Sequence, residues 1–181
     1  MYFYNMFYKC SRFLLIFHSI LFLFSCQNNN KRNADLDSPY EAVIQFSAGE
    51  DYIYGQGELS QAFTPYPFNM GYIRGSKNDQ LRCIILSSKL SPRSRLHINP
   101  IAVFTTQERD LEISYIIAVP AEIDERNIEI YNFSDLVTKY NAVKNIIEFW
   151  ILNRCGLGCA ENLSWGNEST ASFVLEKFKE S

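Results

Sequence analysis

The chain has 181 residues and carries 17 Lys and Arg against 20 Asp and Glu, a formal net charge of −3. Proteins that bind nucleic acid need clustered Lys and Arg to neutralise phosphates. The acidic balance therefore argues against a nucleic-acid partner, and the length suits one domain with a hydrophobic core.

The first 26 residues have a composition of their own. They contain Lys9 and Arg12, no acidic residue, and an apolar run from Phe13 to Phe24. That run is short for a membrane span and typical of the apolar region of a signal peptide. It ends in Leu23-Phe-Ser-Cys26, which is similar to the lipobox of bacterial lipoproteins. We therefore expect residues 1–26 to be a lipoprotein signal peptide; an uncleaved anchor helix and an ordinary signal peptide are the alternatives.

Lipidation of Cys26 would make this residue the new N-terminus and anchor the protein to a membrane of the bacterial cell envelope. Without residues 1–25 the chain keeps 15 basic and 20 acidic residues, a net charge near −5. Residues 27–38 are polar, with one large apolar residue, and predict a flexible tether. The folded domain is then expected over residues 39–181.

Short apolar runs rich in β-branched residues predict strands in the first part of this domain. These runs cover residues 41–46, 81–86, 96–106, 111–119 and 128–131. Residues 69–86 themselves have the pattern of a strand, a polar loop and a second strand. The uniformly apolar segment Ile116–Val119 is expected to be fully buried.

Two helices are predicted at the end of the chain. The first is expected to begin at a Ser134 cap and to run to about Arg154, because apolar residues recur at helical spacing between them. Gly156 would end it. Asn167 can cap the second helix, whose inner face would carry Ala171, Val174, Leu175 and Phe178.

Strands followed by helices predict an α+β fold: a small antiparallel sheet, twisted or closed into a barrel, with two C-terminal helices packed on it. Cys155 and Cys159 could close a small disulfide loop or stay as free thiols. A zinc site is not expected, because His97 is the only His after the signal segment and the chain offers no second Cys pair.

Six segments occur in a fixed order between residues 40 and 180: Tyr66-Pro-Phe-Asn-Met-Gly-Tyr72, Asn78-Asp-Gln-Leu-Arg-Cys-Ile-Ile-Leu86, Pro100-Ile-Ala-Val103, Ile116-Ile-Ala-Val-Pro120, Ile146 to Arg154, and Trp165-Gly166. Their order and spacing resemble those of the family I soluble inorganic pyrophosphatases. The resemblance implies a small β-barrel of OB type with flanking helices. It also implies Mg²⁺-dependent hydrolysis of diphosphate to phosphate, and it leaves a homo-oligomer open.

The family holds Mg²⁺ with carboxylates and grips phosphate oxygens with Lys, Arg and Tyr side chains. In this chain the resemblance assigns the catalytic position beside the attacking water to Asp79. It assigns a phosphate-binding charge to Arg154. Asp79 and Glu108 are the candidate magnesium ligands, and Asp110 and Glu112 are further acidic residues near the same segment.

Several positions depart from the family pattern. The first and last acidic residues of the metal loop become Lys77 and Arg82, which changes the formal charge of the loop by about four units. An acidic ligand position falls at Ile113, and a phosphate-binding lysine position falls at Tyr115. Magnesium would meet repulsion in such a loop. Lys77 and Arg82 could hold a phosphate-like anion directly; the alternative is that the pocket is abandoned and both side chains are solvated surface groups.

We therefore expect an inorganic pyrophosphatase-like protein whose diphosphate hydrolysis is weak or lost, as in a pseudoenzyme. The alternative is a non-catalytic lipoprotein that binds phosphate or diphosphate, or that serves as a scaffold. The expected ligand in either case is a phosphate or diphosphate anion.

Overall fold

The computed structural model describes residues 38, 40–54, 61–76 and 81–179. Residues Ser38–Ser181 form one compact unit. The predicted signal peptide with Cys26, almost all of the predicted tether, and the loop residues Lys77 and Asp79 lie outside the described residues.

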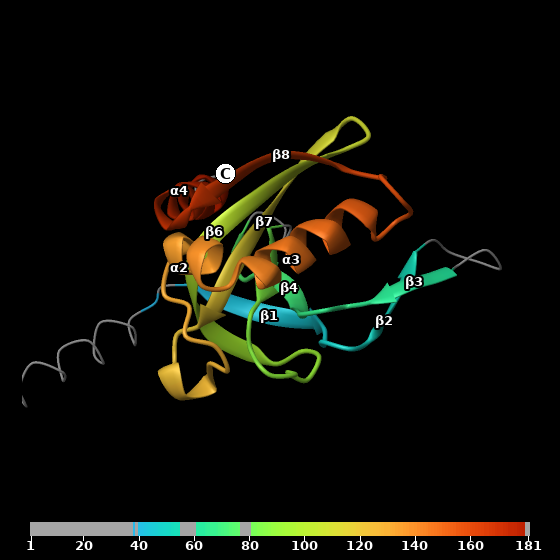
Figure 1. Cartoon of the computed structure of the whole chain (residues 1–181). Helices are drawn as coiled ribbons and strands as arrows, with labels where there is room; N and C mark the ends of the chain where they lie inside the picture. The colour runs from blue at the N-terminus through green and yellow to red at the C-terminus, as the bar shows by residue number, and fades with distance from the viewer. Residues whose placement is uncertain (1–37, 39, 55–60, 77–80, 180–181) are drawn as a thin grey trace, which may run out of the picture. The chain divides into compact units, whose positions relative to one another are not determined.

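Five strands close into a ring: β1 (Glu41–Phe46), β4 (Asn69–Ile73), β5 (Arg82–Ile85), β7 (Leu111–Pro120) and β6 (Arg95–Glu108) (Figure 1). They pair in that order, and β6 returns to β1. All pairs are antiparallel except β5 with β7, which run parallel. The predicted α+β fold of OB-like type is thus confirmed, but the ring is not a regular barrel, and one of its pairs is parallel where the sequence predicts an antiparallel sheet.

Three further strands of the described residues are not part of this ring. Strand β8 (Glu161–Asn167) pairs with the C-terminal half of β6. Strands β2 (Asp51–Tyr54) and β3 (Gln61–Pro65) form a separate two-stranded sheet. The sequence does not predict β8, because its residues are mostly polar and exposed and show no apolar alternation.

Strand β7 is the centre of the core. Its residues from Tyr115 to Val119 are all fully buried, as predicted for Ile116–Val119. Alternate residues point to opposite faces of a strand, and β7 accordingly contributes to two apolar clusters. Tyr115, Ile117 and Val119 belong to a cluster that includes residues of the helices at 133–138 and 141–153. Ile116 and Ala118 belong to a second cluster, which includes residues of the last helix, at 168–179, and of other ring strands.

The strands β1 and β4 approach each other closely at Gly71. A Cβ atom on Gly71 would lie 2.0 Å from the carbonyl oxygen of Val43 on β1. Glycine is therefore required here because the neighbouring backbone occupies the space of a side chain.

Three α-helices follow the ring: α2 (Phe133–Thr138), α3 (Asn141–Asn153) and α4 (Glu168–Lys179). The predicted single helix from Ser134 to Arg154 is wrong, because the helix is interrupted at Lys139–Tyr140 and two helices form instead. There Lys139 and Tyr140 both donate their backbone N–H to the Asp135 carbonyl. The cap of α2 is Asn132 and not Ser134, since the Asn132 side chain accepts from the Asp135 N–H at 2.9 Å.

The second predicted helix is confirmed as α4, and the Asn167 side chain accepts from the Thr170 N–H at 3.1 Å as a cap should. The predicted strand at 128–131 is wrong. Its Ile130 is buried without strand pairing, and the Tyr131 N–H is taken by the Asp135 carboxylate at 3.0 Å. Among the described residues, no helix combines the length and apolar character that a membrane crossing requires.

Candidate functional site

Three ring strands and the end of α3 bring four polar side chains together. Arg82 begins β5 and is the register partner of Tyr115 on the parallel strand β7. Glu108 ends β6, at the β6–β7 hairpin. Arg154 follows directly after the last residue of α3. Glu108 and Tyr115 belong to one hairpin, whereas Arg82 and Arg154 come from segments distant in sequence. We call the four side chains the arginine–tyrosine cluster.

Direct contacts connect this cluster. The Tyr115 hydroxyl donates to Glu108 Oε1 at 2.9 Å and accepts from Arg82 Nη1 at 2.8 Å. Arg154 Nη2 forms an ion pair with the same Glu108 oxygen at 2.5 Å. Both guanidinium groups also lie over the Tyr115 ring, 5.6 Å from its centre for Arg82 and 5.3 Å for Arg154. The ring face adds a cation–π attraction for both.

Burial differs across the cluster. Tyr115 is fully buried and Arg154 is 5% exposed, whereas Glu108 is half-buried and Arg82 is exposed. Burial raises the pKa of Tyr115 to about 12, although the two nearby arginines favour the phenolate. The phenol therefore stays protonated at neutral pH and can donate to Glu108. A buried arginine is costly without a partner, and Glu108 supplies that partner to Arg154.

A pocket of about 360 Å³ opens beside the cluster. Its lining consists of a polar part and an apolar part: Arg82, Glu108 and Arg109, together with Leu111, Ile113, Cys155 and Cys159. Arg109 lies in the β6–β7 turn with φ +54°, a conformation that glycine adopts more readily. The formal charge of the lining is positive, and Arg154 behind Glu108 adds a further positive charge.

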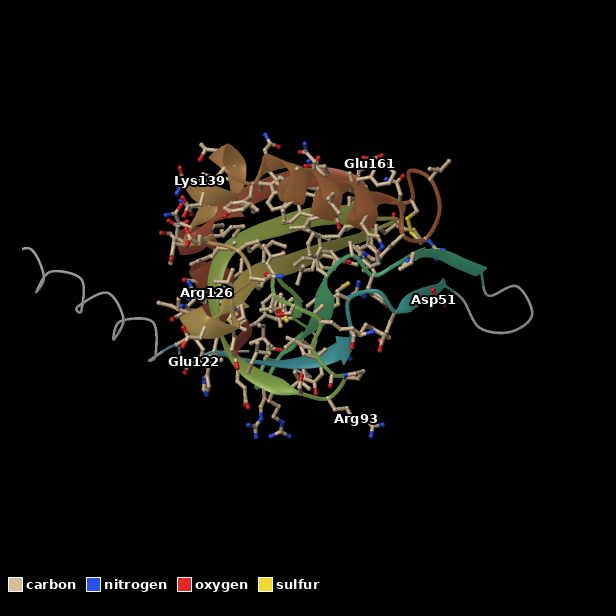
Figure 2. The ribbon with its side chains drawn as sticks, turned by 60° about the horizontal axis from the view of Figure 1, so that its bottom comes forward. Asp51, Arg93, Glu122, Arg126, Lys139 and Glu161 are labelled. Atoms are coloured by element: carbon tan, nitrogen blue, oxygen red, sulfur yellow. A yellow bond between two sulfur atoms is a disulfide. The ribbon has the colours of Figure 1, made fainter. Side chains whose placement is uncertain are left out.

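Cys155 and Cys159 form a disulfide, so the structure adopts one of the two alternatives that the sequence leaves open. Their Cα atoms are 5.8 Å apart. The bridge closes the loop between α3 and β8, where Figure 2 shows it as a yellow bond. Gly156 and Gly158 have φ values of +131° and +66°, and glycine permits this reversal of the chain.

The sequence-predicted site residues have different outcomes. Arg82 and Arg154, predicted to bind phosphate, and Glu108, predicted as a weak metal ligand, lie in one cluster. Lys77 and Asp79 fall outside the described residues, so their placement is not part of this site description. The acidic residues Asp110 and Glu112 are exposed. The functional assignments of all of these residues remain predictions.

Tyr115 is the site residue that the sequence prediction lacks. An apolar strand predicts a core tyrosine at this position, and the ring is indeed buried. The signal that could have identified it is its alignment with the lysine position of the resembled family, two residues after the replaced acidic position Ile113. Its hydroxyl contacts residues 33 and 7 positions away in sequence, and such contacts cannot be read from local pattern.

The described residues at this pocket offer few ligands to the magnesium ions that the resembled family uses, and the predicted ligand Asp79 lies outside the described residues. Mg²⁺ prefers several oxygen ligands, whereas among the residues that the structure describes Glu108 is the only carboxylate in the pocket lining. One of its oxygens is already shared by Arg154 and Tyr115. Over residues 38, 40–54, 61–76 and 81–179, no group of three or more His, Cys, Asp and Glu side chains is arranged to hold a metal ion.

Comparison with known proteins finds similarity in structure. No protein-family model matches the sequence, and no curated protein matches it either. An inorganic pyrophosphatase from Neisseria gonorrhoeae superposes with a TM-score of 0.64 at 21% identity, over 80% of this chain and 92% of the other. The Thermus thermophilus inorganic pyrophosphatase gives 0.63 at 16% identity, over 77% and 88% of the two chains.

The inorganic pyrophosphatase from Helicobacter pylori gives a TM-score of 0.61 at 18% identity, over 80% of this chain and 94% of that one. At such identities the likeness concerns the fold. The chain therefore has the fold of inorganic pyrophosphatases, as the resemblance of its sequence segments predicts.

Proposed function

We propose that this pyrophosphatase-like protein binds a phosphate or diphosphate anion without a metal ion, in the pocket beside the arginine–tyrosine cluster. The observation that carries the proposal is the linked set of Arg82, Tyr115, Glu108 and Arg154. It places two guanidinium groups around one neutralised carboxylate at a pocket of positive charge. Arginine N–H groups bind phosphate oxygens with strong, charge-assisted hydrogen bonds.

Arg82 is the side chain best suited to contact the anion. It is exposed, and one of its N–H donors is engaged with the Tyr115 hydroxyl. A guanidinium has five N–H donors, so Arg82 keeps donors for a ligand while the tyrosine holds its orientation. Arg154 is nearly buried, and its charge acts mainly through the field that it adds to the pocket.

Thermal unfolding of the full-length chain in EDTA tests this binding. Millimolar inorganic diphosphate is expected to raise the Tm of the unmodified chain and to have much less effect on Arg82→Ala. Arg93→Ala is the matched control, because Arg93 is exposed and lies far from the disulfide that lines the pocket (Figure 2). An equal rise in all three proteins, or no rise in any, would contradict the proposal.

We also propose that hydrolysis of diphosphate is weak or lost. Enzymes in general turn over at about 1–10³ s⁻¹, and phosphate release by this chain with Mg²⁺ is expected to be far slower. The assay should be run with and without Mg²⁺, beside Asp79→Asn. Fast release that requires Mg²⁺ and disappears in Asp79→Asn would restore the active-enzyme interpretation.

A lipid anchor at Cys26 is a separate proposal, supported by the apolar run 13–24 and the Leu23-Phe-Ser-Cys26 motif. The mass of the protein extracted from bacterial membranes should show loss of residues 1–25 and gain of acyl chains. Cys26→Ser should abolish both changes. An unprocessed mass in the unmodified chain would refute the anchor and leave the binding proposal unaffected.

A further inference from the structure

The pocket beside the arginine–tyrosine cluster has an apolar wall in addition to its cations. Leu111 and Ile113 from β7 and the Cys155–Cys159 disulfide form this wall. Leu111 is 67% exposed, and Leu157, within the loop that the disulfide closes, is 83% exposed. An inorganic anion gains nothing from such a surface, since apolar groups cannot replace the water around a phosphate.

Ile113 makes the contrast sharper. The family resemblance expects an acidic ligand at this position, and the chain has a β-branched apolar residue there. If the position had only lost its metal-binding role, any uncharged polar side chain could have replaced the acidic residue. Ile113 instead continues the apolar surface of Leu111 toward the core, where it packs against the hydrophobic core residues that surround Tyr115.

The size of the pocket agrees with this view. Its volume of about 360 Å³ lies within the range of roughly 300–1,000 Å³ that pockets for organic ligands occupy. Such pockets are mainly apolar with a few placed polar groups, whereas the lining of this pocket is apolar and polar in about equal parts. Here Arg82 and Arg109 would hold the charged end of a ligand, and Leu111, Ile113 and the disulfide would contact its apolar part.

We infer that the preferred ligand is an organic phosphate or diphosphate, in which an apolar group is esterified to the anion, and not the free inorganic ion. The inference rests on the proposed anion binding and specifies its ligand class. Two sources share this chemistry: a lipid-type diphosphate with a hydrocarbon chain, and a nucleotide with a base. Binding involves no covalent step.

Calorimetric titration of the full-length chain in detergent and EDTA tests the inference with three probes: inorganic diphosphate, geranyl diphosphate and adenosine diphosphate. At least one organic probe is expected to bind about tenfold tighter than the inorganic ion, the gain from burying roughly two methylene groups. A preference for geranyl diphosphate indicates the lipid source, and a preference for adenosine diphosphate indicates the nucleotide source. Titration into detergent alone provides the blank.

Leu111→Ser should remove this advantage, so that the Kd of the preferred organic probe approaches the Kd of inorganic diphosphate measured on the same variant. Phe173→Ser on α4 is the matched control, because Phe173 is 69% exposed and does not line the pocket. Equal affinity for all three probes, or an advantage that survives Leu111→Ser, would overturn the inference and leave the anion-binding proposal standing. If no probe binds, the anion-binding proposal fails, and this inference fails with it.

Discussion

At the scale of single residues, the Tyr115 hydroxyl connects the charged side chains of the site to one another. It donates to Glu108 and accepts from Arg82 while the ring stays fully buried. A phenylalanine would keep the packing and lose both hydrogen bonds. The half-buried Glu108 would then depend on Arg154 alone among the partners described here, and Arg82 would lose the contact that orients it.

The raised pKa of Tyr115 gives a pH prediction. Its ordinary pKa is 10.0, and burial raises the pKa to about 12 in the folded chain. A pKa raised by folding stabilises the native state below the unfolded value and loses that contribution as pH rises through the folded value. We therefore expect Tyr115 to destabilise the chain by about 2–3 kcal/mol between pH 10 and 12.

Urea denaturation at pH 8 to 12 measures this effect. Tyr115→Phe should be less stable than the unmodified chain at pH 8, and its stability should fall less steeply above pH 10. Tyr131→Phe is the control for the loss of a phenol hydroxyl, because Tyr131 is 52% exposed and lies outside the cluster, and its stability at pH 8 should match that of the unmodified chain. Parallel profiles for Tyr115→Phe and the unmodified chain would contradict the assignment.

At the scale of elements, closure of the ring depends on the contact between β1 and β4. In Gly71→Ala the new Cβ would overlap the Val43 carbonyl, 2.0 Å away, so the strands must separate. We expect a loss of at least about 3 kcal/mol or a failure to fold. Gly49→Ala is the comparison, because its Cβ would meet no atom within 4 Å and only its φ of +81° is strained. Similar losses in the two variants, measured by urea denaturation, would disprove the steric account.

The disulfide loop that ends α3 is a second element-scale prediction. A bridge across so short a loop restricts the unfolded chain modestly, and removing it is expected to cost about 2 kcal/mol. Dithiothreitol should therefore lower the urea midpoint of the unmodified chain. The double variant Cys155→Ser with Cys159→Ser should show the lower midpoint already and should not respond to the reductant. A midpoint insensitive to reductant in the unmodified chain would show that the bridge contributes no stability.

The elements show how far the sequence could be read. Strands β1, β5, β6 and β7 lie where apolar runs predict them, because burial itself produces such runs. Strand β8 lacks that signal, and tertiary contacts hold it instead: it pairs with β6, and the Trp165 and Asn162 side chains donate to Glu148 on α3. The break between α2 and α3 likewise depends on capping contacts and not on apolar spacing.

For the site, the resembling sequence segments gave roles to Arg82 and Arg154, and Glu108 was a candidate ligand because it is an acidic residue that precedes the segment 116–120. The sequence could not supply Tyr115 as the common partner of these residues, because a tyrosine in an apolar strand is more often a core residue. Nor could it decide whether Cys155 and Cys159 pair, since that depends on the distance between them in the folded chain.

At the scale of the whole molecule, the site exists only when the ring is closed. It combines side chains from β5, β6, β7 and the end of α3, and Arg82 meets Tyr115 only through the parallel pairing. A fold can therefore keep its core while the residues at one end change their chemistry. A ligand in this pocket would bind the folded chain and not the unfolded one.

This linkage predicts global stabilisation by the ligand. Diphosphate at about 100 times its Kd should raise the free energy of unfolding by about 2.7 kcal/mol. Urea denaturation in EDTA measures the rise, and Arg82→Ala at the same diphosphate concentration should show little of it. A rise of equal size in Arg82→Ala would mean that the anion acts elsewhere on the surface.

The left-handed backbone of Arg109 sets stability against recognition. A glycine in this turn would relieve strain of about 1 kcal/mol, so Arg109→Gly is expected to melt at a higher temperature. The same change would take a guanidinium from the rim of the pocket and weaken its hold on anions. Arg109 therefore lowers the stability of the β6–β7 hairpin relative to glycine, and it provides a positive charge to the pocket.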